Sequence, residues 1–314
     1  MRRRYLLAAF WIALISMAGR LCAGQQQVPT VAELLTANGV PDALVRPSER
    51  TMHLNGFDVR KEGPLRLFAW MSKSGDEDVL TVARYDTATK HILRKELKDG
   101  STGVEDDSAA SRSRYTDTPV DTAVWGMCLH DVGFSEQKTE WLILTTHVNP
   151  SLGCTLLLDD QLQFHFLING WVYETVGDSF VIEESMIHFA PTHPAKLTVF
   201  NPKTGEVERV YPRPGDPVRT AYQAKLRAYL ASEEECGEKN LACDVESMDA
   251  SVESVQMLSP TVFAFTITLS PAGMGERAEK EVPEQTTIYI AKLVDGKWQV
   301  KPSTKTGPHL PEQE

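Results

Sequence analysis

From Gly63 onward, hydrophobic and polar residues alternate with a period of two along much of the chain, and β-branched and aromatic residues fill many of the hydrophobic positions. This period is typical of strands with one buried face, whereas an amphipathic helix repeats every 3.6 residues. Clusters of Gly, Pro, Asn, Asp and Thr interrupt the alternation and are typical of turns. The pattern therefore predicts a mainly β fold built from antiparallel hairpins.

Four segments predict individual hairpins. In the clearest one, alternation over residues 162–168 reaches Asn169-Gly170, a strong two-residue turn signal, and resumes to residue 176. His165 alternates with the phenylalanines of that segment, so we expect its imidazole to face solvent. The other three hairpins are predicted around the turn residues 86–90, 201–205 and 295–296.

Two segments have helical signals instead. Thr30 is a favourable N-cap for a short helix over residues 31–36, which we expect to be an N-terminal clasp on the main domain. Asp216 and Pro217 begin a second helix. Its apolar residues are spaced to form one stripe that packs on a sheet: Tyr222, Leu226, Tyr229 and Leu230.

The hairpins of residues 79–97 and 197–211 share a pattern of apolar strand, Asp or Asn, Thr-containing turn and second strand. This pattern resembles the outer strand pair of a β-propeller blade. The chain thereby resembles exported bacterial β-propeller-like proteins of uncharacterised function. The resemblance implies blades of antiparallel strands. We therefore predict antiparallel hairpins in a propeller-like or meander sheet arrangement, and the helix that begins at Asp216 and Pro217 predicts, with the strands after it, a small α+β C-terminal region.

The N-terminus predicts export. Residues 2–4 are arginines, and an apolar run of about 14 residues follows at 5–18, within the range of a signal peptide. Cys22-Ala23-Gly24 supplies small residues for cleavage, so the mature chain is expected to begin near Gln25. An N-terminal membrane anchor and lipid attachment at Cys22 are the alternatives. We expect a secreted or periplasmic monomer with no membrane span in the mature chain.

These signals divide the chain into five regions. They are a signal peptide (1–24), an N-terminal helix and linker (25–62), an antiparallel β region (63–212), an α+β region (213–302) and a disordered tail (303–314). Polar composition also predicts disorder within residues 99–122.

Cleavage at Gln25 leaves four cysteines. Oxidising compartments permit disulfides, and proximity along the chain favours Cys236 with Cys243 and Cys128 with Cys154. Four free buried thiols are the alternative. The spacing lacks the C-x-x-C motif typical of zinc sites, so we expect no metal at the cysteines.

The net charge of the chain limits the kinds of partner that it can bind. The chain has 43 acidic and 32 basic residues, and its formal net charge is −11. Nucleic acids and anionic membranes are bound chiefly through lysine and arginine. The acidic balance therefore argues against both.

Candidate chemistry is sparse. His188 and His193 are candidates to share a metal or a substrate, and surface or turn roles are the alternative. Asp244, Glu246 and Asp249, with Glu253, are candidate oxygen ligands for a hard cation such as calcium, although their spacing departs from that of an EF-hand loop. The carboxylates of Asp159-Asp160 and Glu183-Glu184 are adjacent, so each pair should point to opposite faces of a strand and have turn or rim roles. No zinc-protease, serine-hydrolase or phosphate-loop motif occurs. We therefore predict no cofactor and assign no catalytic residue.

Three functions remain. The first is a binding or interaction module for an extracellular or periplasmic protein or glycan. The second is a hydrolase or lyase that acts on a polymer through carboxylates and histidines from separate loops, which requires the histidines to converge with Asp or Glu in one pocket. The third is a structural envelope component with a large exposed apolar patch.

Overall fold

The computed structural model describes residues 28–54, 56–102, 119–136, 139–149, 152–184, 195–232, 248–271 and 276–303. The predicted signal peptide, most of the polar loop within residues 99–122 and the tail after Ser303 lie outside them. The chain divides into two compact units between Asn55 and Gly56.

The N-terminal unit contains the predicted short helix, α2 (Val31–Ala37). The Thr30 hydroxyl accepts a hydrogen bond from the Glu33 amide at 3.2 Å, and the Glu33 carboxylate accepts one from the Thr30 amide at 2.7 Å. This capping box satisfies donors that the first helical turn leaves free. Two 3₁₀ turns follow, η1 (Asp42–Leu44) and η2 (Pro47–Arg50). The helix is confirmed, and its role as a clasp stays a prediction.

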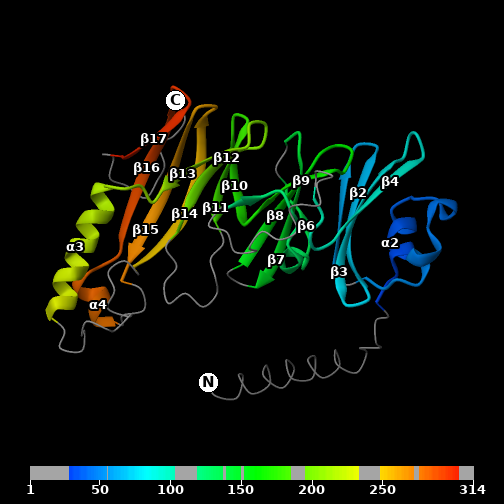
Figure 1. Cartoon of the computed structure of the whole chain (residues 1–314), viewed down its shortest axis with the longest axis horizontal. Coiled ribbons are helices and arrows are strands. Elements are labelled where there is room, and N and C mark those ends of the chain that lie inside the picture. The colour runs from blue at the N-terminus through cyan, green and yellow to red at the C-terminus, as the bar shows by residue number, and fades with distance from the viewer. Residues whose placement is uncertain are drawn as a thin grey trace, which may run out of the picture. The chain divides into compact units, whose positions relative to one another are not determined.

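The second unit is mainly β, with 17 strands in four antiparallel sheets over the described residues (Figure 1). Three sheets are meanders in which each strand pairs with the next: sheet 1 of β1 (Phe57–Glu62), β2 (Leu65–Ser74), β3 (Glu77–Asp86) and β4 (His91–Leu97); sheet 3 of β10 (Gly170–Val176), β11 (Ser179–Glu184), β12 (Leu197–Asn201) and β13 (Glu206–Tyr211); and sheet 4 of β14 (Asp249–Ser259), β15 (Val262–Ser270), β16 (Gln285–Val294) and β17 (Lys297–Pro302). Sheet 2 has the order β5-β9-β8-β7-β6, from β5 (Val120–Asp121), β6 (Gly133–Phe134), β7 (Leu142–Asn149), β8 (Leu152–Leu158) and β9 (Phe164–Ile168).

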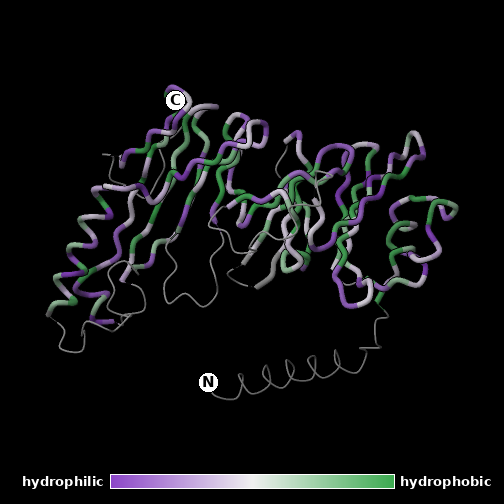
Figure 2. The backbone as a smooth tube through the Cα atoms, viewed as in Figure 1, coloured by the Kyte–Doolittle hydropathy of each residue, from purple (hydrophilic) through white to green (hydrophobic). Residues whose placement is uncertain are grey.

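Three of the four predicted hairpins are confirmed. β3 pairs with β4, β12 with β13, and β16 with β17, each across the expected turn. Figure 2 shows hydrophobic residues concentrated inside the strands and hydrophilic residues at many of the turns. The first strand begins at Phe57, earlier than the predicted start of the β region at Gly63. The sequence does not indicate β1, because β1 is an edge strand without a fully buried residue and its hydrophobic pattern is weak.

The predicted hairpin around Asn169-Gly170 is wrong. β9 pairs with β8 and β5 in sheet 2, whereas β10 pairs with β11 in sheet 3, so the chain passes from one sheet to the next at this dipeptide. Gly170 lies opposite Glu184, and its carbonyl accepts a hydrogen bond from the Thr155 hydroxyl at 2.9 Å. A glycine at this position therefore allows β10 to approach its neighbouring strands closely.

Successive sheets pack through shared hydrophobic clusters. Sheet 2 contacts sheet 1 through one face, where Leu156 and Leu167 are buried, and sheet 3 through the other, where Leu157 and Ile168 are buried. Alternation fails in these strands because both faces exclude water. A third cluster joins sheet 3 to sheet 4 and to the helices α3 (Pro217–Ser232) and α4 (Glu276–Glu281).

The predicted stripe of α3 packs into this third cluster, as expected. The Asp216 carboxylate accepts a hydrogen bond from the Val218 amide at 2.9 Å and caps the helix. Its second oxygen accepts one from the buried Tyr289 hydroxyl at 2.8 Å, which ties the start of α3 to β16.

A disulfide joins Cys128 to Cys154, with 5.7 Å between their Cα atoms. Cys128 ends the 3₁₀ turn η4 (Gly126–Cys128) and Cys154 lies in β8, so the bond ties the long connection before β6 to the middle of sheet 2. Cys236 and Cys243 lie outside the described residues. Within the parts of the chain that are described, no helix combines the length and apolar character needed to span a membrane.

Candidate functional site

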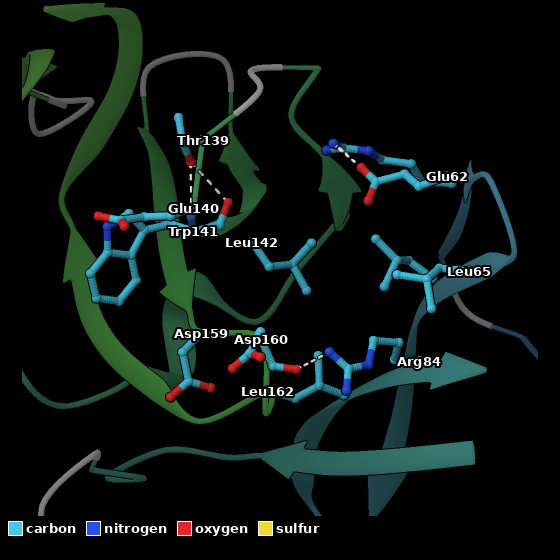
Figure 3. Close-up of a pocket in the computed structure, with 12 residues that line it drawn as sticks. Glu62, Leu65, Arg84, Thr139, Glu140, Trp141, Leu142, Asp159, Asp160 and Leu162 are labelled. Atoms are coloured by element: carbon cyan, nitrogen blue, oxygen red, sulfur yellow. Dashed lines mark hydrogen bonds and ion pairs between the residues drawn. The ribbon is translucent and has the colours of Figure 1, made fainter. Parts of the chain in front are cut away.

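An open pocket of about 150 Å³ lies between sheet 1 and sheet 2 (Figure 3). Sheet 1 contributes the ends of β1 and β3 and the start of β2, and sheet 2 contributes the segment that leads into β7 and the turn between β8 and β9. Strand ends from both sheets therefore build the pocket, and its lining residues lie far apart in the sequence.

Leucines form the apolar part of the pocket: Leu65, Leu67, Leu142 and Leu162. Leu67 and Leu162 are buried, whereas Leu65 and Leu142 are half-buried and directed toward one another across the pocket (Figure 3). Leu65 and Leu142 are the first residues of β2 and β7, so their strands hold them at the open end of the packed core. The half-buried pair is the apolar surface that a ligand can reach.

Charged side chains surround these leucines. Arg60 forms an ion pair with Glu62 and donates a hydrogen bond to the Ser135 carbonyl at 2.5 Å. Arg84 donates to the Asp160 carbonyl (Figure 3). Because both arginines belong to sheet 1 and both carbonyls to loops of sheet 2, these bonds hold the two sides of the pocket together.

Asp159 is the most constrained carboxylate of the pocket. It accepts hydrogen bonds from the main-chain N–H groups of Gln161 at 2.9 Å and Gln163 at 2.8 Å, and from His165 Nε2 at 2.9 Å. Partial burial works to raise the pKa of the Asp159 carboxyl, but these hydrogen bonds outweigh burial and its pKa lies below the usual value. The Trp141 indole packs edgewise on His165, with 5.1 Å between ring centroids, and fixes the imidazole.

A lowered pKa at Asp159 predicts acid-sensitive stability. The unfolded carboxyl titrates near pH 3.9. The contribution of Asp159 is therefore complete above about pH 5 and is lost as the pH falls through the lower, folded pKa. The substitution Asp159→Asn keeps an oxygen that can accept the turn amides but removes the titrating group. We expect urea unfolding between pH 6 and 3 to show a smaller loss of stability for Asp159→Asn than for the wild type, and equal losses would contradict the assignment.

The predicted histidine sites are only partly described. His130 is exposed and does not line the pocket, and its Nδ1 lies 3.4 Å from Oδ2 of the neighbouring Asp131. The His165 side chain is 40% exposed, so its imidazole faces solvent as predicted, and its Nε2 lies 2.9 Å from Asp159 Oδ2. Its face of β9 is covered at one end by Trp141. His188 and His193 lie outside the described residues, as does the side chain of His147.

The predicted cation site, too, lies only partly within the described residues. Asp249 begins β14 and Glu253 lies in the same strand, while Asp244 and Glu246 fall outside the described part of the chain. Within that part, no three His, Cys, Asp or Glu residues are grouped to hold a metal ion.

The adjacent glutamates of β11 point to opposite faces, as expected from their spacing. Glu184 is buried and accepts hydrogen bonds from the Arg209 guanidinium at 3.0 Å and the Thr198 hydroxyl at 2.5 Å. On the other face, Glu183 contacts Tyr173, and burial raises the pKa of the Glu183 carboxyl. Neither glutamate lines the pocket.

Sequence reasoning missed most of this pocket. Asp159 and Asp160 form a carboxylate pair in the sequence, but Arg60, Arg84 and Trp141 stand in no recognisable motif. The one local signal was the position of charged residues beside turns, which many surface hairpins share.

This arrangement is suited to binding. An apolar centre surrounded by oriented charged groups is the usual composition of a recognition pocket. Asp159 is held in its ionised form, which cannot donate a proton as a general acid at neutral pH. A comparison of the chain with protein-family models gives no match, and a comparison with curated proteins gives none either.

Proposed function

We propose that this chain is an exported binding protein that takes an apolar side chain of a partner protein into the pocket between sheets 1 and 2. The observation that carries the proposal is the half-buried leucine pair, Leu65 and Leu142, inside a ring of charged side chains. Protein interfaces commonly have this composition, with an apolar centre and a polar rim.

Pocket size supports one occupant of moderate volume. An apolar protein cavity of about 150 Å³ holds one benzene molecule. The pocket here has about the same volume, so the ring of a phenylalanine or a leucine side chain fills it. Burying such a side chain contributes roughly 1.5 to 3 kcal/mol.

The rim adds orientation. Arg60 and Arg84 are held by main-chain carbonyls of sheet 2, so their guanidinium groups are positioned before a partner arrives. Positioned charges chiefly improve selectivity and the rate of encounter. A partner with complementary polar groups around its apolar side chain is thereby favoured over a purely apolar one.

Export is part of the proposal. The arginines and apolar run of the N-terminus are typical of a signal peptide. The Cys128–Cys154 disulfide is compatible with an oxidising compartment, where such bonds persist.

Panning of a random peptide library on the purified mature chain tests the binding proposal. We expect selected peptides to share a Phe or Leu, and Leu65→Arg to weaken their binding about ten- to hundredfold, because the long cationic side chain fills the pocket. Met257→Arg is the matched control, since Met257 is an exposed apolar strand residue that does not line the pocket.

Two outcomes would overturn the proposal. Equal binding by the Leu65→Arg and wild-type proteins would exclude this pocket as the binding site. Cleavage products after incubation with an array of glycans and envelope polymers, read by mass spectrometry, would replace binding by the hydrolase or lyase alternative.

A further inference from the structure

A second pocket, of about 200 Å³, lies between sheet 3 and sheet 4. Its apolar lining includes Val199, Val207, Leu293 and Trp298. Val207 is 45% exposed on β13, an edge strand of sheet 3, whereas Trp298 is buried. The second pocket therefore repeats the composition of the first, with reachable apolar surface between two packed sheets.

Lys203 connects the borders of the two pockets. It lies in the turn between β12 and β13, and its Nζ is 3.1 Å from Glu140 Oε1, in the border of the first pocket. The same Nζ is 2.9 Å from Asp178 Oδ1, in the turn that precedes β11. Ser179 and Asn201, which flank these two turns, line the second pocket. Both pockets thus open beside one set of strand ends, joined by a single lysine.

Charge on this surface is predominantly acidic. Carboxylates outnumber cationic groups among the lining residues of the two pockets and the turns that Lys203 joins. The acidic residues are Glu62, Glu140, Asp159, Asp160, Asp178, Glu206 and Glu208, and the basic residues are Arg60, Arg84, Lys203 and Lys297. The chain as a whole has a net charge of −11. A cationic partner is therefore attracted to the surface, and an anionic one is repelled.

We propose that the two pockets form one binding surface for an extended, basic polypeptide segment that places one apolar side chain in each pocket. The inference rests on the proposed function of the first pocket. It adds that the partner is positively charged and has a second apolar side chain, which the second pocket binds. Lysine or arginine residues between the anchors face Asp160, Asp178 and Glu206. Occupying the second pocket is then intramolecular, which raises affinity without any new contact in the first.

Synthetic peptides of one design test this surface. Each has two phenylalanines separated by a Gly-Ser spacer of increasing length, with lysines in the spacer and at the ends. Matched peptides replace one phenylalanine by alanine, or all lysines by glutamates. Affinities are measured by fluorescence anisotropy at low and at physiological salt.

We expect one spacer length to bind at least about tenfold more tightly than either single-phenylalanine peptide. Val207→Arg should remove that gain, whereas Leu65→Arg should weaken the binding of both the two-phenylalanine and the single-phenylalanine peptides. Met257→Arg controls for the added charge, because Met257 lines neither pocket. Glutamate peptides should bind at least about tenfold more weakly, and this difference should shrink with added salt.

The results separate this inference from the proposed function. If Leu65→Arg weakens binding but no spacer length exceeds the single anchor, or Val207→Arg has no effect on two-anchor peptides, the joint surface is wrong and the first pocket stands. Tighter binding of the glutamate peptides would overturn the basic partner. If Leu65→Arg leaves the affinity of every peptide unchanged, both the proposed function and this inference are wrong.

Discussion

Replacing Gly170 by alanine is expected to destabilise the protein by about 3 kcal/mol or more, or to prevent folding. Its φ of 151° lies in a region that residues with a side chain rarely adopt, which costs roughly 1 to 3 kcal/mol. An added Cβ would also lie 2.0 Å from the Glu183 carbonyl oxygen. That oxygen belongs to the main chain of β11 and cannot move without breaking the pairing of β10 with β11, so overpacking adds a further cost. Urea unfolding followed by tryptophan fluorescence measures the change.

Gly133→Ala is the matched control. Gly133 also lies in a strand, β6 of sheet 2, but an added Cβ would meet Asp58 Oδ2 at 3.7 Å and Thr145 Oγ1 at 3.8 Å, which are ordinary contacts. We expect its stability to change by less than about 1 kcal/mol. A similarly small effect at Gly170 would contradict the close approach of Gly170 to the main chain of β11.

Removing the disulfide with the double substitution Cys128→Ala and Cys154→Ala is expected to cost about 3.5 kcal/mol. The bond closes a loop with a sequence separation of 26, and restricting a loop of that length in the unfolded chain accounts for this magnitude. Both cysteines are buried in the cluster between sheets 1 and 2, where alanine also leaves a small cavity. Urea unfolding without reductant measures the loss.

Reductant supplies the control for this prediction. Reduced wild type should unfold at nearly the urea concentration of the reduced double variant, since both then lack the bond. Labelling of thiols in the unfolded, unreduced wild type should find Cys128 and Cys154 protected. Free thiols at these two positions, or equal stability of the double variant and the oxidised wild type, would contradict the disulfide.

Local sequence signals determined much of the secondary structure. The turn residues 201–205 and 295–296 join strands that pair as predicted, because each turn and its two strands are neighbours in the chain. Thr30 and Asp216 cap their helices through amides only two or three residues away. Such elements depend on contacts within a few residues, so the alternation and the capping residues suffice to predict them.

The tertiary structure alone decided how the sheets are divided and where the pocket lies. Asn169-Gly170 has the composition of a hairpin turn. However, Leu167 and Ile168 are buried on opposite faces of sheet 2, so β9 belongs to that sheet, whereas β10 pairs with β11 in the next sheet. The pocket residues Arg60, Arg84 and Leu142 meet only after two sheets have packed. Contacts between distant segments depend on which faces exclude water together, and a period of two along one strand does not specify its partner sheet.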